Sequence, residues 1–254
     1  MKTSTEEWRL RCELAACFRL LAHFRMTDLI YTHVTVRLPG PEHHFLINPY
    51  GLMFEEITAS SLVKLRLDGS LVDPGPHRVN LAGFVIHGAI HAARKDAQCV
   101  LHTHTRAGCA VAAQRDGLLP VNQISLEFYG RVAYHDYEGI AYELDEQKRL
   151  VRDLGEHPVM ILRNHGLLTV GSTVAQAFLR MYYLEKACEI QLAALGTGVP
   201  LSLPSDDVCR RTERQFRLPP ATPAPQLVSD PDGLNLGWDA LLRLLERLDP
   251  GYRS

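Results

Sequence analysis

The segment CVLHTHT (99–105) is the most informative stretch of this 254-residue chain. Its apolar first half predicts a buried β-strand, and His102 and His104 lie at the far end. Side chains alternate along a strand with a period of two, so both imidazole rings are expected on the same side. Two rings placed in this way can reach one divalent ion with Zn–N bonds of about 2.0–2.1 Å. The pair alone is also compatible with histidines at the surface or at the edge of the core.

A second apolar segment, PVMILRNHG (158–166), also ends in a histidine, His165, within a predicted turn. Strand ends are positions where a rigid scaffold presents side chains to a site. If the two strands lie close together in the sheet, His102, His104 and His165 form a face of three imidazoles. Three protein ligands with open positions are typical of a catalytic metal rather than a closed structural one. The alternative is three unrelated histidines that each have their own partners.

Two further histidines, His87 and His91, are spaced i, i+4 in the segment IHGAIH (86–91). This spacing places them on one face of a helix. The arrangement is similar to the HExxH metal helix, but Gly88 stands where that motif has its glutamate. We therefore predict that His87 and His91 pack behind the ligands or support them, and do not bind the ion themselves.

The remaining periodicity indicates an α/β domain with a mixed sheet, because strands and helices alternate without a strict βαβ order. The predicted helices are 6–24, 80–94, 143–155 and 173–195, and the predicted strands include 29–38, 45–48, 98–104, 158–163 and 167–170. Beyond Pro200 the proline content predicts an extended connector. A final leucine-rich helix, 238–248, is expected to dock on the same subunit or on a neighbouring one. We therefore divide the chain into a domain, 1–200, and a C-terminal extension, 201–254.

Composition narrows the class of protein. The 27 basic and 29 acidic residues leave a formal charge of −2, which removes the broad electrostatic case for binding nucleic acid or an anionic membrane. No apolar run approaches the ~20 residues of a membrane span. The six cysteines are dispersed and form no CxxC pair, as expected of reduced thiols. These features predict a cytoplasmic protein that acts on a small molecule.

Taken together, the blocks 45–69, 80–105 and 163–171 resemble the class II aldolase/adducin family. The resemblance covers roughly residues 6–200, and the tail LDPGYRS is similar to the tails of adducin-like bacterial members. It implies a three-layer α/β/α fold with a central, mostly antiparallel mixed sheet. It also implies a homotetramer with active sites between subunits.

The same resemblance implies that His102, His104 and His165 bind one divalent metal ion per subunit. Zinc is the usual ion in the family, and manganese or iron are the alternatives. Three neutral imidazoles leave such an ion strongly electrophilic, so it can bind adjacent oxygens of a hydroxy-ketone or 2-keto acid and accept charge as a C–C bond breaks.

The chain departs from the sugar-phosphate aldolases of this family at three positions. Their catalytic glutamate aligns with Gly83, which can neither transfer a proton nor bind a metal. Their phosphate-binding Gly-Asn aligns with Thr32-His33, and their second phosphate turn aligns with Tyr50-Gly51. We therefore expect a substrate other than a sugar phosphate, with His33, Tyr50 and Gly51 as candidate substrate-binding residues.

A replacement for the missing base is sought in the segment LEFYGRVAYHDYEG (126–139), which borders the site by resemblance. Tyr129, His135 and Tyr137 are the candidate catalytic residues, because a tyrosine or histidine near a metal can donate a proton to a developing carbanion. The alternative for each is ordinary aromatic packing or a surface loop. Tyr252 and Arg253 are a further expectation, as tail residues that reach a neighbouring subunit's site.

Three functions follow from these observations. The first is a metal-dependent lyase that performs retro-aldol cleavage or decarboxylation of a small hydroxy or keto acid. The second is an oxygenase-like relative that holds Fe(II), since three histidines hold iron as well as zinc. The third is a non-catalytic, adducin-like assembly protein. We rank the third last, because the chain keeps all three histidines and lacks the long basic tail of the adducins.

Overall fold

The computed structural model describes residues 3–40, 42–73, 75–139, 145–218 and 234–254. A seven-stranded sheet runs through the described part of the chain in the order β3-β2-β1-β4-β7-β6-β5. Every neighbouring pair is antiparallel except β5 and β6. The strands are β1 (His33–Arg37), β2 (Phe45–Ile47), β3 (Val63–Leu65), β4 (Cys99–Thr103), β5 (Val132–His135), β6 (Val159–Leu162) and β7 (Gly166–Gly171).

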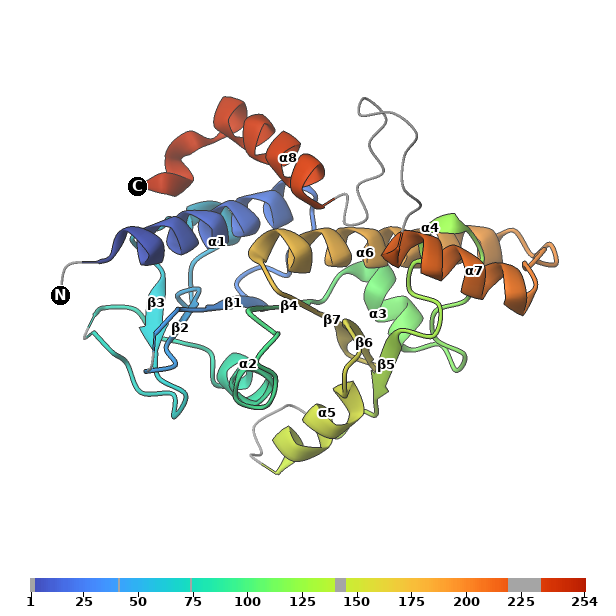
Figure 1. The fold of residues 1–254 in the computed structure, drawn as a ribbon, viewed down its shortest axis with the longest axis horizontal. Helices are drawn as coiled ribbons and strands as arrows, with labels where there is room; N and C mark the ends of the chain where they lie inside the picture. The colour runs from blue at the N-terminus through green and yellow to red at the C-terminus, as the bar shows by residue number, and fades with distance from the viewer. Residues whose placement is uncertain (1–2, 41, 74, 140–144, 219–233) are drawn as a thin grey trace.

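Helices cover both faces of the sheet (Figure 1), with α1 and α6 on one side and α2 and α5 on the other. The α-helices are α1 (Thr5–His23), α2 (Leu81–Ala93), α3 (Arg106–Ala112), α4 (Gln123–Leu126), α5 (Glu146–Leu154), α6 (Val174–Gly196), α7 (Asp206–Arg217) and α8 (Leu234–Leu248). Two short 3₁₀ helices, η1 (Phe54–Glu56) and η2 (Pro250–Arg253), complete the described elements. This confirms the three-layer α/β/α architecture with a mostly antiparallel mixed sheet that the family resemblance implies.

The alternation of side chains along β4 explains how one strand serves two cores. Cys99 and Leu101 belong to the large apolar cluster under α1 and α6, whereas Val100 belongs to the cluster on the α2 and α5 side. His102 has the same parity as Val100, so its ring lies on the α2 side. All five residues of β4 are buried, which fixes the register of the strand and therefore the position of this ring.

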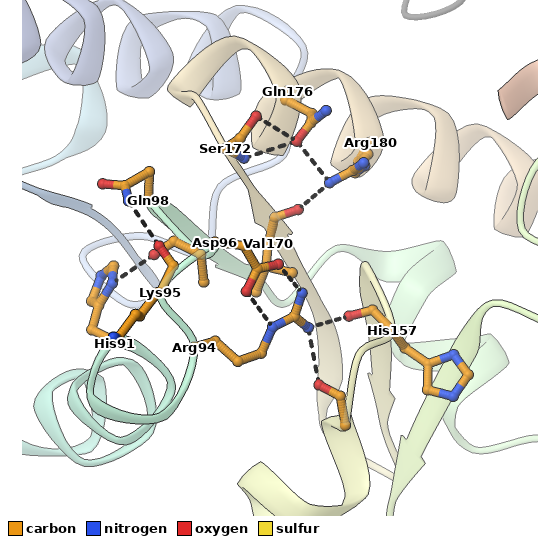
Figure 2. Close-up of polar contacts among 12 residues, drawn as sticks. His91, Arg94, Lys95, Asp96, Gln98, His157, Val170, Ser172, Gln176 and Arg180 are labelled. Carbon is orange, nitrogen blue, oxygen red and sulfur yellow. Dashed lines mark hydrogen bonds and ion pairs between the residues drawn. The ribbon is translucent and has the colours of Figure 1, made fainter. Parts of the chain in front are cut away.

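The two ends of the central strands differ in chemistry. At the end away from His102, Arg94 donates to the carbonyl oxygen of His157 at 2.7 Å and pairs with Asp96, and Arg180 donates to the carbonyl oxygen of Val170 at 2.7 Å (Figure 2). These polar groups bind one another and join the chain segments around β7. At the opposite end the histidines gather, and that end is where we look for a site.

The C-terminal extension differs from the sequence prediction in one respect. Residues 206–217 form helix α7 where we predicted an extended connector, because the acidic residues Asp206 and Asp207 in the first turn favour a helix start despite the preceding proline. Most of the predicted connector, 219–233, lies outside the described residues.

The tail beyond α8 packs on its own subunit. Trp238 and Leu245 of α8 enter the large apolar cluster beneath α1 and α6. Tyr252 is buried there too, with its hydroxyl 2.6 Å from the Glu246 carboxylate, and Arg253 pairs with the same carboxylate. In the described conformation both residues contact their own subunit, and the contact of Tyr252 and Arg253 with a neighbour's site stays a prediction. No described helix is both long and apolar enough to cross a membrane.

Candidate metal centre

Three imidazoles converge at the end of β4 and the start of β7. The Nε2 atom of His104 lies 2.9 Å from Nε2 of His102 and 2.9 Å from Nε2 of His165. Within the described residues, these three form the one group of histidine, cysteine or acidic side chains whose ligand atoms could hold a single ion. His102 is buried, while His104 and His165 are half-buried, so the group is accessible from one side.

The partners of the other ring nitrogens fix which atoms are free to bind. Nδ1 of His102 lies 2.9 Å from the carbonyl oxygen of Leu167, and Nδ1 of His104 lies 2.9 Å from the Asp28 carboxylate. Both partners can only accept, so we assign the proton of each neutral ring to Nδ1 and the lone pair to Nε2. Two lone pairs that face each other at 2.9 Å repel, and a cation bound between them removes the repulsion. The donor set therefore fits a divalent metal ion.

Burial keeps the His102 and His165 rings neutral. Loss of solvation is the largest cause that lowers the pKa of His165 to about 4 and the pKa of His102 well below its usual range, and the neighbouring histidines are the smaller cause. A neutral imidazole is the form that binds a metal ion. His102 and His165 are therefore in their ligating form at neutral pH without first having to release a proton.

The turn Asn164-His165-Gly166 is specified locally by its residue types. Asn164 has a φ of 55°, a left-handed conformation that asparagine adopts at low cost. Gly166 lies so close to β4 that a Cβ atom there would overlap the carbonyl oxygen of Thr103, and it would lie 3.3 Å from the His102 ring and 3.2 Å from the His104 ring. The glycine therefore allows β7 to approach β4 and lets His165 meet the other two rings.

Asp28 is a residue of the candidate metal centre that our sequence analysis missed. It lies in the segment 25–32, where Arg25, Leu29 and Thr32 all have positive φ values. Such conformations are unusual for residues other than glycine and are concentrated at functional sites. Asp28 is 76 residues from His104 in sequence, so no short motif could have revealed the contact.

We expect Asp28→Asn to lower the metal affinity of the protein by about tenfold or more, because a carboxylate that accepts from a ligating histidine raises its basicity and orients its ring. Competition with a chelator measures the effect. Asp207→Asn, at an exposed position on α7, is the matched control and should leave the affinity unchanged. Equal affinities for the two variants would contradict a supporting role for Asp28.

Behind His102, His104 and His165, a buried chain of hydrogen bonds joins β1 to α2. Thr35 Oγ1 lies 2.8 Å from Nδ1 of His87 and 2.8 Å from Nε2 of His91, and Nδ1 of His91 lies 3.0 Å from the carbonyl oxygen of Ala97. Because that carbonyl only accepts, His91 donates from Nδ1, Thr35 donates to His91, and His87 donates from Nδ1 to Thr35. His87 and His91 are thus absent from the metal-ligand group, as predicted from the missing glutamate.

We expect Thr35→Val to lower the free energy of unfolding by about 3 kcal/mol, because the isosteric change leaves two buried imidazole nitrogens without a partner. Urea denaturation of the metal-free protein measures the effect. Thr212→Val removes a hydroxyl that bonds within helix α7 and should change the stability by less than about 0.5 kcal/mol. A Thr35→Val variant as stable as the wild type would show that the hydrogen bonds of Thr35 to His87 and His91 do not stabilise the fold.

Comparison with known proteins agrees with this geometry. The family described as "Class II Aldolase and Adducin N-terminal domain" matches residues 12–192. The chain belongs to this family. A putative aldolase class 2 protein of Caulobacter vibrioides is 47% identical over 99% of this chain and 94% of its own length. Rat alpha-adducin is 44% identical over 96% of this chain, which spans about a third of that longer protein (34%).

Solved structures with a similar fold also belong to the class II aldolases. An aldolase II superfamily protein from Pseudomonas syringae is 53% identical, with a TM-score of 0.90 over 99% of this chain and 97% of the other. An L-fuculose 1-phosphate aldolase from Glaciozyma antarctica is 30% identical, with a TM-score of 0.83 over 100% of this chain and 95% of the other. Aldolases and adducins are therefore both among the relatives of this chain.

At position 83 of the aldolase/adducin domain, the imidazole of His33 takes up the room beside the glycine. A Cβ atom on Gly83 would lie 2.9 Å from the imidazole of His33. His33 is paired with His102 in the β1–β4 register, and its ring centroid is 5.3 Å from that of His102. The resemblance to sugar-phosphate aldolases implies a glutamate at position 83, and in this chain His33 lies against that position.

The remaining candidate residues of the domain are distributed over three places. His135 is buried with Nδ1 2.8 Å from the Asp153 carboxylate, and it lines a crevice together with Tyr137 and the metal-ligand candidate His165. Tyr129 instead bonds through its hydroxyl to Asp206 of α7. The structure thus brings His135 and Tyr137 to the side of His165, and directs Tyr129 to α7.

The predicted substrate turn follows β2. Tyr50 and Gly51 come after β2, and the Tyr50 ring lies 6.3 Å from that of Tyr31, which precedes β1. β1 and β2 are antiparallel neighbours, so this turn and the segment before β1 leave the sheet at the edge where His102 lies. Tyr50 is partly exposed, and Gly51 has a φ of 107° that favours glycine.

Proposed function

We propose that this chain is a metal-dependent lyase that cleaves or decarboxylates a small hydroxy or keto acid rather than a sugar phosphate. The observation that carries the proposal is the convergence of three imidazole Nε2 atoms, 2.9 Å from one to the next, at an accessible end of the sheet. Lyase chemistry of this kind needs an electrophile with open positions, and this donor set supplies three ligands and no more.

In this proposal two of the three ligand rings have a defined support. His102 is held by the Leu167 carbonyl and His104 by Asp28, so both rings keep their lone pairs directed at the common point. When bound there, a divalent ion supplies Lewis-acid stabilisation of the negative charge that develops on a substrate oxygen as the C–C bond breaks. We propose one ion per subunit, with zinc favoured over manganese and iron.

The reaction also needs a proton donor for the product. We propose His135 or Tyr137 for this role, because both line the crevice beside His165. Asp153 holds the His135 ring through Nδ1, and the buried Nε2 atom lies 3.6 Å from the Glu146 carboxylate. Tyr129 remains a candidate whose described partner is Asp206, and it reaches a site only if a second subunit supplies one. We also propose that the protein is cytoplasmic and forms a homotetramer with active sites between subunits.

The departures at the phosphate positions support the choice of substrate class. Thr32-His33 and Tyr50-Gly51 stand where the sugar-phosphate aldolases, by resemblance, bind phosphate. Gly83 removes the acid/base group that those enzymes need at the start of the reaction. Decarboxylation needs no base at that point, because the bond that breaks already carries the leaving carboxylate.

Assembly without catalysis is a second candidate, favoured by the 44% identity to alpha-adducin. Anaerobic incubation of metal-loaded protein with a panel of small 2-keto and hydroxy acids separates the possibilities. The lyase proposal expects aldehyde or carbon dioxide without oxygen. Product formed only with oxygen uptake would favour an Fe(II) oxygenase, and failure to bind zinc, manganese or iron would favour assembly.

A further inference from the structure

The His33 imidazole is unusual among the polar groups near the metal centre. It is 4% exposed, and neither ring nitrogen has a hydrogen-bond partner in the part of the chain that the structure describes. Its ring centroid lies 4.2 Å from that of His87, whose Nε2 also lacks a partner there. Buried polar groups in proteins are nearly always bonded, so an unbonded ring beside a metal centre points to a partner that enters the site.

We propose that His33 is the specificity-determining residue of this site: its ring fills the space left by Gly83, and it binds the carboxylate of a substrate held at the metal centre. The inference rests on the function proposed above. A glutamate at position 83 would place a negative charge in that space, whereas an imidazole carries no negative charge in either of its protonation states. A substrate carboxylate would be repelled by the first arrangement and accepted by the second.

Three contacts fix the position of the His33 ring beside the candidate metal centre. Position 83 is directly beneath it, since a Cβ atom there would lie 2.9 Å from two ring carbons and 3.1 Å from Nε2. The ring packs edge-on against that of His102, at 61° between the planes. His33 also shares the α2 side of β1 with Thr35, whose bonds to His87 and His91 fix the wall behind it.

The His33 ring is free of hydrogen bonds but closely packed. The ring centroids of His87 and His102 lie 4.2 Å and 5.3 Å away, so a turn about the χ2 bond moves these neighbours as well. No hydrogen bond from another described residue holds either nitrogen, and an N–H that turns toward a carboxylate therefore breaks no existing bond. The new bond is charge-assisted, which makes it stronger than one to a neutral oxygen.

The test is calorimetric binding to the zinc-loaded protein of two small probes that differ in charge. Oxalate carries carboxylates, and dihydroxyacetone is a neutral hydroxy-ketone with adjacent oxygens. We expect His33→Ala to weaken oxalate binding by about tenfold or more, the usual scale for a hydrogen bond to a charged group, and dihydroxyacetone binding by less than about threefold. His33→Asn restores an N–H donor and should recover part of the oxalate affinity.

The exchange variant is the sharper experiment. His33→Ala combined with Gly83→Glu puts a carboxylate in the vacated space and should weaken oxalate by about 100-fold while dihydroxyacetone still binds. His44→Ala is the matched control, because it removes another buried imidazole, one that pairs with Glu42 at 3.4 Å beside the other end of β1. It should bind both probes as the wild type does.

Three other outcomes would contradict the proposal. Equal weakening of both probes in His33→Ala overturns the carboxylate contact and leaves the lyase proposal intact. Loss of zinc from His33→Ala, measured by metal analysis before the titration, makes His33 a ligand and also overturns the contact. Wild-type protein that binds neither probe in a zinc-dependent way removes the proposed function, and the inference with it.

Discussion

His104→Ala should abolish metal binding and leave the fold intact. The Nε2 atom of His104 is the central one of the three, at 2.9 Å from each of the others, so its loss leaves two separated nitrogens. We expect the metal content of the purified protein to fall from about one ion per subunit to near zero. Emission spectrometry of protein dialysed against a fixed zinc concentration measures this content.

The fold should survive because the triad lies at a strand end and not within an apolar cluster. His104 is partly exposed and follows the last residue of β4. In the metal-free protein the substitution also removes a lone pair that faces that of His102, so the free energy of unfolding should be unchanged or slightly higher. The comparison must use metal-free samples, since an ion that binds only the folded state raises its stability. A collapsed thermal transition in metal-free His104→Ala would indicate a structural ion instead.

Gly166→Ala should damage both the fold and the site. The added Cβ atom would overlap the Thr103 carbonyl oxygen, and main-chain atoms of a paired strand cannot move aside as a flexible side chain can. We expect a loss of about 3 kcal/mol in the free energy of unfolding, the upper range for overpacking a close contact. Because the same atom would lie within 3.3 Å of the His102 and His104 rings, the metal affinity should fall as well.

Gly196→Ala is the matched control for this substitution. Gly196 is the last residue of α6, and a Cβ atom there would meet nothing within 4 Å. Replacing glycine by alanine in a compatible helical position stabilises a protein by roughly 0.4–1 kcal/mol. We therefore expect urea denaturation to show changes of opposite sign in the free energy of unfolding of the two variants. A Gly166→Ala variant that is as stable as Gly196→Ala would show that β7 does not need its close approach to β4.

The convergence of His102, His104 and His165 could be predicted from sequence because local rules place these residues. The period of two along CVLHTHT puts His102 and His104 on one side, and the turn after β6 presents His165 at the same edge. The fold class followed from the alternation of elements together with the family resemblance. These inferences depend on patterns of a few residues, which a single sequence displays directly.

The supporting residues could not be predicted, because they are brought together only by the folded chain. Asp28 meets His104, and Thr35 meets His87 and His91, across 52 to 76 positions of sequence. Helix α7 was missed for a different reason. Its Ser205 cap and acidic first turn were visible, but nearby prolines outweighed them in our interpretation.

The most direct test of the account is the position of the ion itself. A crystal of the zinc-loaded protein, measured at the zinc absorption edge, should show one anomalous peak per subunit at about 2.0–2.1 Å from the Nε2 atoms of His102, His104 and His165. A peak bound by other residues, or no peak from protein that retains its fold, would contradict the central claim that these three rings form a metal centre.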